Sequence, residues 1–477
     1  MSMYYLFDHG KWMVLSSTSL GVFVMTLNAS VVNIALPLIT SYYQAPLSSV
    51  EWVVLVYLII MSSLMLTFGR LGDLYGHKPV YVRGFLIFTV GSLLCVLSPD
   101  ILSLIASRAV QAVGAGMGIS VVQAIIADAF PPGIRGRAIG LNSVSVSLGL
   151  AAGPSLGGFL LSHFGWKIIF AINIPIGIAS TIWAWRVIPG KKGSPQQFDI
   201  LGAFLLFMCL MCFLLALSHG QQWGWGSRPV LGLLLGFLAF FAAFFYRERH
   251  YRFPMLHFKL FNNRQFTAAN IAQGLNYITQ YIVTFLMPFY LLNILRLSSG
   301  QAGIVMAAFP LAMIVTSPLS GIISDRIGAR VPASLGMGLI SASIYCLSSL
   351  EPSSSPGLVA GALFGTGLGN GLFITPNNSA IMGSVPKDQI GLASGMVATM
   401  RSIGQALGIA VGGAVLSSRL FYYAGQFGLQ GGENFLYQDE VFTLAQHDTF
   451  LMAMAVGIIG MVVSLVRGAK NEEETEI

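Results

Sequence analysis

The stretch ILSLIASRAVQAVGAGMGISVVQAIIA, residues 101–127, decides the fold class, because it holds a single charge, Arg108, in a run long enough to cross a bilayer. Asp100 and Asp128 bound it, and the same separation of charged from apolar sequence recurs along the chain. Of 477 residues, 55% are hydrophobic and 9% charged, whereas roughly a quarter of a soluble domain is charged. The sequence therefore predicts an all-α polytopic membrane protein.

Fourteen apolar runs are candidate membrane spans. Helices are expected because backbone polar groups in lipid must be satisfied within their own segment. The runs lie at 12–36, 51–69, 80–98, 101–127, 136–162, 167–189, 200–217, 229–247, 265–293, 300–324, 331–349, 357–382, 389–418 and 449–467.

The distribution of Lys and Arg predicts the orientation. With the N-terminus inside, most of the 25 basic residues fall in cytoplasmic loops or ends, as the positive-inside rule requires. Four face outward: Lys167, Arg228, Arg296 and Arg419. Both termini are therefore predicted to be cytoplasmic, in a multi-pass protein of the cell (plasma or inner) membrane. Basic loops beside anionic lipid account for the pI near 9.2 without a nucleic-acid partner.

The spans group as six, two and six. We expect an N-terminal bundle at 1–189, a linker with two further spans at 190–264, and a C-terminal bundle at 265–477. The last part includes an outward loop at 419–448 and an acidic cytoplasmic tail. The loop GRLGDLYGHK at 69–78 is echoed by GIISDRIGAR at 321–330, which indicates two equivalent halves. Repeated halves predict a cavity near the midplane that opens alternately to either side.

The loop at 69–78 is a candidate gate. Its glycines suit a tight helix-to-helix turn, and its Asp73 can meet either the first turn of a neighbouring helix or a basic side chain. Arg135 and Arg137 are candidate basic partners, and an ordinary solvated loop is the alternative. The predicted gating residues of the two halves are Gly69, Arg70, Asp73, Gly76, Lys78, Asp128, Arg135, Arg137, Asp325 and Arg326.

The string GLAAGPSLGG at 149–158 predicts a bent helix that packs closely. Glycines four residues apart permit close approach of another helix, and proline removes a backbone hydrogen bond. The residues concerned are Gly149, Gly153, Pro154, Gly157 and Gly158. Generic helix packing is the alternative to a conformational role.

Arg108 lies deep in a span, where a functional role is the default hypothesis and pairing with carbonyls is the alternative. Gln111 follows on the same helix. Arg401 is the counterpart in the second half, although it lies nearer the cytoplasm and could simply reach the interface.

These strings resemble hallmark motifs of the major facilitator superfamily. They are the loop at 69–78, RAVQ at 108–111 and the glycine-proline string at 149–158. LNASVVNIALP at 27–37, Trp166-Lys167 with Phe170, NIPIG at 173–177 and Phe198-Asp199 are similar to motifs of its fourteen-span drug:proton antiporters. The resemblance covers nearly the whole chain. It implies two six-helix bundles plus two central helices, and efflux of amphipathic compounds driven by proton entry, with Arg108 tuning a proton-carrying carboxylate.

The chain departs from that family at Asn28, where the first-span motif carries Asp, and in a minor way at Leu74, where a basic residue is common. Asn cannot exchange a proton, and the acids otherwise lie in loops or at span ends. A neutral to positive cavity favours neutral or anionic amphipathic substrates over cations. The candidate cavity residues are Asn28, Asn33, Tyr57, Arg108, Gln111, Asn276, Tyr277, Gln280, Asn370 and Asn377, with interhelical hydrogen bonding as the alternative for each.

Proton coupling is predicted with no obvious carrier. Candidate coupling residues are Arg108, Glu51, Asp128 and Arg401. The expected partners are a small-molecule substrate, protons and the lipid bilayer, without ATP, because the sequence has no phosphate-binding Gly-x-x-x-x-Gly-Lys-Ser/Thr loop. No metal, cofactor or enzymatic activity is predicted. A lipid or metabolite facilitator not driven by protons, or a non-transporting sensor, is the alternative.

Overall fold

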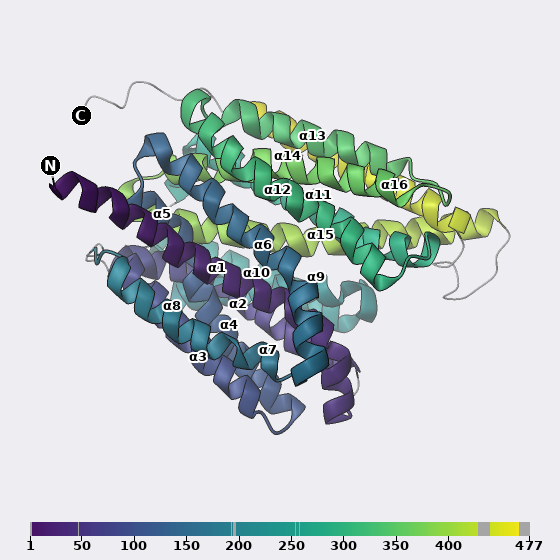
Figure 1. The fold of residues 1–477 in the computed structure, drawn as a ribbon, viewed down its shortest axis with the longest axis horizontal. Helices are drawn as coiled ribbons and strands as arrows, with labels where there is room; N and C mark the ends of the chain where they lie inside the picture. The colour runs from purple at the N-terminus through teal and green to yellow at the C-terminus, as the bar shows by residue number, and fades with distance from the viewer. Residues whose placement is uncertain are drawn as a thin grey trace. The chain divides into compact units, whose positions relative to one another are not determined.

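The computed structural model describes residues 2–45, 47–191, 193, 197–252, 254–256, 258–427 and 439–466. The side chains of Asn33, Glu51 and Pro154, together with Gly158, lie outside this description, as do residues 428–438 of the predicted outward loop and the tail from 467. Every regular element in the described part of the chain is a helix (Figure 1).

The helices follow the apolar runs. In chain order, the elements are α1 (Ser2–Tyr43), α2 (Leu47–Tyr75), α3 (His77–Leu97), α4 (Ile101–Ser120), α5 (Val122–Ala129), α6 (Pro132–Phe164), α7 (Ile168–Ala171), α8 (Asn173–Val187), α9 (Ile200–Trp223), α10 (Arg228–His250), η1 (Phe258–Asn262), α11 (Arg264–Phe289), η2 (Tyr290–Ile294), α12 (Ser299–Ile327), α13 (Arg330–Ser348), α14 (Pro356–Gly383), η3 (Lys387–Gln389), α15 (Ile390–Gln426) and α16 (Asp439–Leu465).

Thirteen helical segments of the described chain are long and apolar enough to cross a membrane. The remaining predicted span, 136–162, lies within α6, which includes residues whose side chains are outside the description. Large apolar side chains are exposed on these helices; on α10 they include Leu235 at 67%, Leu238 at 57% and Phe241 at 50%. Such surfaces suit contact with lipid rather than water. The predicted all-α polytopic fold is confirmed.

Local sequence explains where several helices begin and end. Asp100 caps α4 by accepting a hydrogen bond from the Ser103 amide at 2.8 Å, and Ser298 with Gln301 forms a capping box at α12. Gly76, between α2 and α3, has φ of 93°, and Gly328, between α12 and α13, has φ of 82°. Because residues with a Cβ atom rarely adopt such positive φ angles, glycine is needed at both turns.

The chain separates into two compact units, which we describe individually. Unit 1 comprises residues 1–215, 231–259 and 382–399, and unit 2 comprises 216–230, 260–381 and 400–477. The described side chains of each unit enclose their own apolar core, around Phe85 and Phe88 in unit 1 and around Ile340 and Phe442 in unit 2. The predicted division at 189/190 and 264/265 stays a prediction.

Glycines allow close helix packing in both units. In unit 1, a Cβ on Gly149 of α6 would lie 3.0 Å from the Phe23 carbonyl oxygen of α1. In unit 2, a Cβ on Gly404 or Gly408 of α15 would lie 2.7 Å from a carbonyl oxygen of α11. The backbones of α6 and α1, and those of α15 and α11, are therefore in direct contact. The glycine spacing on α6 predicts this close packing for unit 1.

Candidate functional site

Arg108 of α4 is a buried cation of unit 1, with 1% of its surface exposed. Its Nε donates to the Val53 carbonyl oxygen of α2 at 2.9 Å, and an Nη donates to the Gln111 side-chain oxygen. Its guanidinium carbon lies 4.1 Å from the Tyr57 ring centroid and 5.6 Å from that of Phe170 on α7. Within the part of the chain that the structure describes, no carboxylate contacts Arg108.

Gln111 links Arg108 to α3, because its Nε2 donates to Ser92 Oγ at 2.7 Å. Gly91, next to Ser92, lies so close to Gln111 that an added Cβ would sit 2.6 Å from the Gln111 backbone nitrogen. The Arg108–Gln111–Ser92 chain is thus held by closely packed helices.

Asn28 of α1 is buried beside Asn173 of α8, whose Nδ2 donates to Asn28 Oδ1 at 2.9 Å. The Asn28 Nδ2 has no hydrogen-bond acceptor among the described residues. Asn28 is therefore a fixed neutral group with one free donor, and Asn173 is a partner that the candidate cavity residues do not include.

Unit 2 contains its own group of buried amides. Asn377 of α14 donates to Gln273 Oε1 of α11 at 2.6 Å and to the Ala269 carbonyl at 3.2 Å, and Asn276 Nδ2 lies 3.6 Å from Met337 Sδ. Arg401 lies close to the hydroxyl group of Tyr277.

Several buried amide side chains of unit 2 have polar atoms that make no hydrogen bond in the described part of the chain. Both side-chain amide atoms of Asn370, and the amide oxygens of Asn276 and Gln280, have no hydrogen-bond partner there. Buried amides without partners are costly, so they suit sites that a polar ligand or water completes.

The segment 69–78, predicted as a loop, is helical except at Gly76, and the end of α2 and the start of α3 build a charged cluster in unit 1. Both Asp73 oxygens accept backbone N–H groups at the start of α15: Gly391 N at 2.6 Å and Leu392 N at 2.7 Å. A carboxylate at a helix N-terminus is stabilised by the helix dipole and by unpaired N–H groups. Of the two kinds of partner that the sequence suggests for Asp73, the structure shows both: the first turn of a neighbouring helix and, in His77, a basic side chain.

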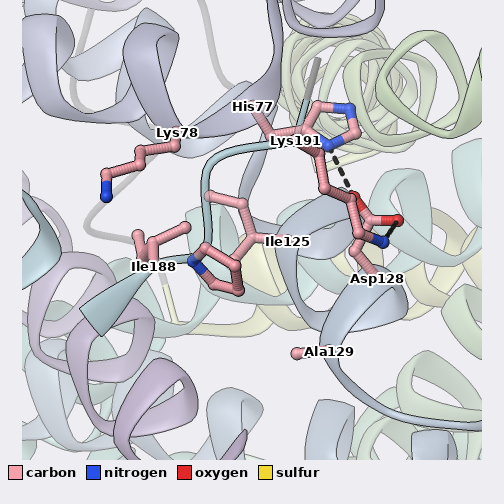
Figure 2. A pocket seen from close by; sticks show the side chains of 8 residues that line it. His77, Lys78, Ile125, Asp128, Ala129, Ile188 and Lys191 are labelled. Atoms are coloured by element: carbon pink, nitrogen blue, oxygen red, sulfur yellow. Dashed lines mark hydrogen bonds and ion pairs between the residues drawn. The ribbon is translucent and has the colours of Figure 1, made fainter. Parts of the chain in front are cut away.

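His77, at the start of α3, joins two acids of this cluster. Its Nε2 lies 3.3 Å from Asp73 Oδ1. Its Nδ1 lies 2.9 Å from Asp128 Oδ2, and Lys191 Nζ lies 2.9 Å from Asp128 Oδ1 (Figure 2). The motif reading did not single out His77 or Lys191, although the spacing of Asp73 and His77, four residues apart, was a usable signal.

The other predicted gating residues are placed as follows. Gly69 packs so tightly on Gly391 and Gly395 that a Cβ would overlap the Gly391 carbonyl, and Arg70 is buried. Arg137 lies over the Trp12 ring at 5.5 Å, and Arg135 donates to the Ala127 carbonyl at 3.3 Å. In unit 2, Asp325 is partly exposed and Arg326 exposed.

The fold defines a helical membrane protein with many spans, which carries buried polar groups in both units. The family model of the Major Facilitator Superfamily matches residues 18–261 and 269–467. The chain belongs to the Major Facilitator Superfamily, whose members are transporters of small molecules.

Similar proteins include transporters of several kinds. The riboflavin transporter RibZ of Clostridioides difficile (strain 630) is 35% identical over 97% of this chain and 99% of its own length. The tetracenomycin C resistance and export protein of Streptomyces glaucescens is 30% identical, over 86% of this chain and 76% of its own. The multidrug resistance protein Stp of Mycobacterium tuberculosis (strain CDC 1551 / Oshkosh) is 32% identical over the same shares.

A solved structure shows the same fold. The human organic anion transporter MFSD10 (TETRAN) superposes with a TM-score of 0.66 at 15% identity, covering 95% of this chain and 99% of the other. At that identity the likeness concerns the fold alone.

Proposed function

We propose that this protein is a proton-coupled efflux transporter of multidrug type that moves neutral or anionic amphipathic compounds by alternating access. We place it in the cell membrane with both termini in the cytoplasm, as the distribution of basic residues predicts. Its similarity to drug-resistance exporters over most of its length supports the efflux assignment.

The observation that carries the substrate preference is the state of Arg108. It is a fully buried cation that contacts a carbonyl, an amide and two aromatic rings, and no described carboxylate. An uncompensated positive charge at low dielectric repels a second cation and attracts an anion or a polar group. Asn28 adds no negative charge.

Neutral polar heterocycles are a second substrate class supported by specific observations. The relative at 35% identity is named as a riboflavin transporter and matches this chain almost end to end. Riboflavin is uncharged and offers both donors and acceptors. Buried amides with unused atoms, such as Asn370 in unit 2 and Asn28 in unit 1, suit ligands of this kind.

Among the predicted coupling residues, Asp128 is tied to His77 and Lys191, and Arg401 lies near Tyr277. Glu51 lies outside the described side chains. The loop at 69–78 is the proposed gate, since Asp73 holds the first turn of α15 within unit 1.

The test is flux through the purified protein in proteoliposomes, with and without a pH gradient. Riboflavin, riboflavin 5′-phosphate and ethidium form a neutral, anionic and cationic series. We expect the neutral or anionic compound to be carried about tenfold better than ethidium, and flux to respond to the gradient. Equal transport of ethidium removes the substrate proposal, and flux that ignores the gradient removes the proton coupling.

Asn28→Asp sharpens this test. The new carboxylate provides a negative charge and a titratable group, so cation transport should rise by about tenfold and depend more steeply on pH. Asn28→Ser is the matched neutral control and should leave the ranking of the three compounds unchanged. Unchanged ethidium flux in Asn28→Asp would speak against a charge-based selectivity.

A further inference from the structure

We propose that the His77 imidazole, held between the carboxylates of Asp73 and Asp128, is a proton-binding site. Its protonation controls the hydrogen bonds between Asp73 of α2 and the first turn of α15. The inference rests on the proposed function only for its use in transport, where it supplies the proton carrier that Asn28 cannot be. The binding itself follows from the geometry of unit 1.

Counting donors and acceptors assigns the proton. An ionised carboxylate can only accept hydrogen bonds, and a neutral imidazole has one N–H group and one lone pair. His77 faces a carboxylate oxygen with each ring nitrogen, at 2.9 Å and 3.3 Å. With both acids ionised, both contacts are hydrogen bonds only when both nitrogens carry protons, which is the imidazolium form.

The surrounding donors stabilise the ionised form of the two acids and oppose the effect of burial on Asp73. Asp73 receives the backbone N–H groups of Gly391 and Leu392, one on each oxygen, and Asp128 receives the Lys191 ammonium. Charged donors and helix N-termini stabilise carboxylates. With His77 protonated, two negative and two positive groups balance in a site where the His77 side chain is 11% exposed.

Other charged groups near the cluster are accounted for. Arg70 of α2 interacts electrostatically with Asp73, with Asp388 of η3 and with Glu248 of α10, and Lys78 of α3 lines the cavity beside His77. From α15, the groups that face Asp73 are the backbone N–H groups of Gly391 and Leu392. His77 is the histidine of this group, positioned between the two acids that it touches.

Loss of the proton acts on α15 through one shared atom. Asp73 Oδ1 accepts from Gly391 N and also faces His77 Nε2. If the shorter contact to Asp128 keeps the remaining N–H, the Nε2 lone pair points at Asp73 Oδ1 and repels it. The backbone around Gly391 leaves little room to adjust, because a Cβ there would lie 2.7 Å from Asp73 Oδ1 and 2.9 Å from His77 Nε2. Deprotonation therefore weakens the hydrogen bonds that hold α15.

A small cavity beside His77 is large enough to hold water. It has a volume of about 30 Å³ and is lined by His77, Lys78, Asp128 and Lys191 with apolar residues of α5 and the segment after α8 (Figure 2). One water molecule needs about 10–15 Å³ on this measure and two or more polar partners, both of which the cavity offers. A water molecule can thus be accommodated beside the imidazole.

The experiment is hydrogen–deuterium exchange of the peptide covering residues 387–396 in nanodiscs, across a pH series and corrected for intrinsic exchange rates. In the wild type we expect protection of this peptide to fall about tenfold from acid to alkaline pH, as one hydrogen bond is lost. Protection that is independent of pH in the wild type overturns the proposal without any variant.

Variants locate the titrating group. His77→Arg keeps a permanent cation with several donors and should remove the pH dependence while leaving protection high. His77→Gln should show low protection at every pH. His447→Gln, at a histidine of unit 2 that contacts the Ser348 carbonyl, is the control and should behave as the wild type. Persistence of the wild-type pH dependence in His77→Gln also overturns the proposal.

Exchange is measured without substrate or gradient, so its failure is distinct from failure of the proposed function. A flat exchange profile with intact transport removes the His77 site alone. A pH-dependent profile in a protein that moves no solute counts against the transport proposal alone.

Discussion

The turn at Gly76, between α2 and α3, and the turn at Gly328, between α12 and α13, both use a glycine with positive φ after an acid three residues earlier. Asp73 is buried and bonded to His77 and to two backbone amides of α15, whereas Asp325 is partly exposed. Ala329 stands where the first turn has His77. The turn glycine and the acid before it are thus common to both units, and the histidine that contacts that acid belongs to the first turn.

The largest expected effect separates the two acids. Asp73→Asn removes the charge that the α15 amides and His77 share, so the transport rate should fall by at least about tenfold. Asp325→Asn should change it by less than about twofold, because Asp325 is partly exposed and Ala329 stands where the first turn has His77. The initial rate of substrate uptake into proteoliposomes, per amount of monodisperse protein, gives both numbers. Equal losses in the two variants would show that the turns are functionally alike.

The intermediate effect separates the two glycines. Alanine at either position is strained by the positive φ, at a cost of roughly 1–2 kcal/mol. At Gly76 the new Cβ would also lie 2.5 Å from the Lys191 carbonyl oxygen, whereas nothing lies within 4 Å at Gly328. Thermal unfolding in detergent should therefore give a lower Tm for both variants and a clearly larger decrease for Gly76→Ala.

Gly133→Ala serves as the reference for that experiment, because Gly133 lies in the first turn of α6 with no atom within 4 Å of a Cβ. It should leave Tm almost unchanged. A Gly328→Ala decrease as large as that of Gly76→Ala would mean that φ alone, and not the contact with residue 191, sets the cost.

The sequence predicts what the lipid dictates and misses what helix packing decides. Length and hydropathy locate the spans, because each must cover the same apolar thickness. The glycines at 76 and 149 are equally visible, since backbone geometry and close approach require them. The partners of buried polar groups are different: His77 meets Asp128 from 51 residues away, and Asn28 meets Asn173 from 145 residues away. Nothing in the local pattern fixes which helices become neighbours. The sequence therefore predicts that Asp73 meets a helix N-terminus, but it does not predict that this helix begins near Gly391.

The smallest expected effect concerns Lys191, which extends the first turn's cluster to the surface. Its ammonium contacts Asp128 at 2.9 Å, but its side chain is 57% exposed. Exposed ion pairs contribute about 0.2–1 kcal/mol and are screened by salt, so Lys191→Ala should lower transport less than about threefold, and only at low ionic strength. Uptake at two salt concentrations measures this, with Lys191→Arg as the charge-retaining control and Arg330→Ala, at an exposed cation of the second turn, as the comparison. Only an ion pair shielded from solvent resists screening by salt. A salt-independent loss as large as that of Asp73→Asn would therefore mean that Asp128 depends on Lys191 rather than on His77, and that the important contact of the first turn lies at its surface.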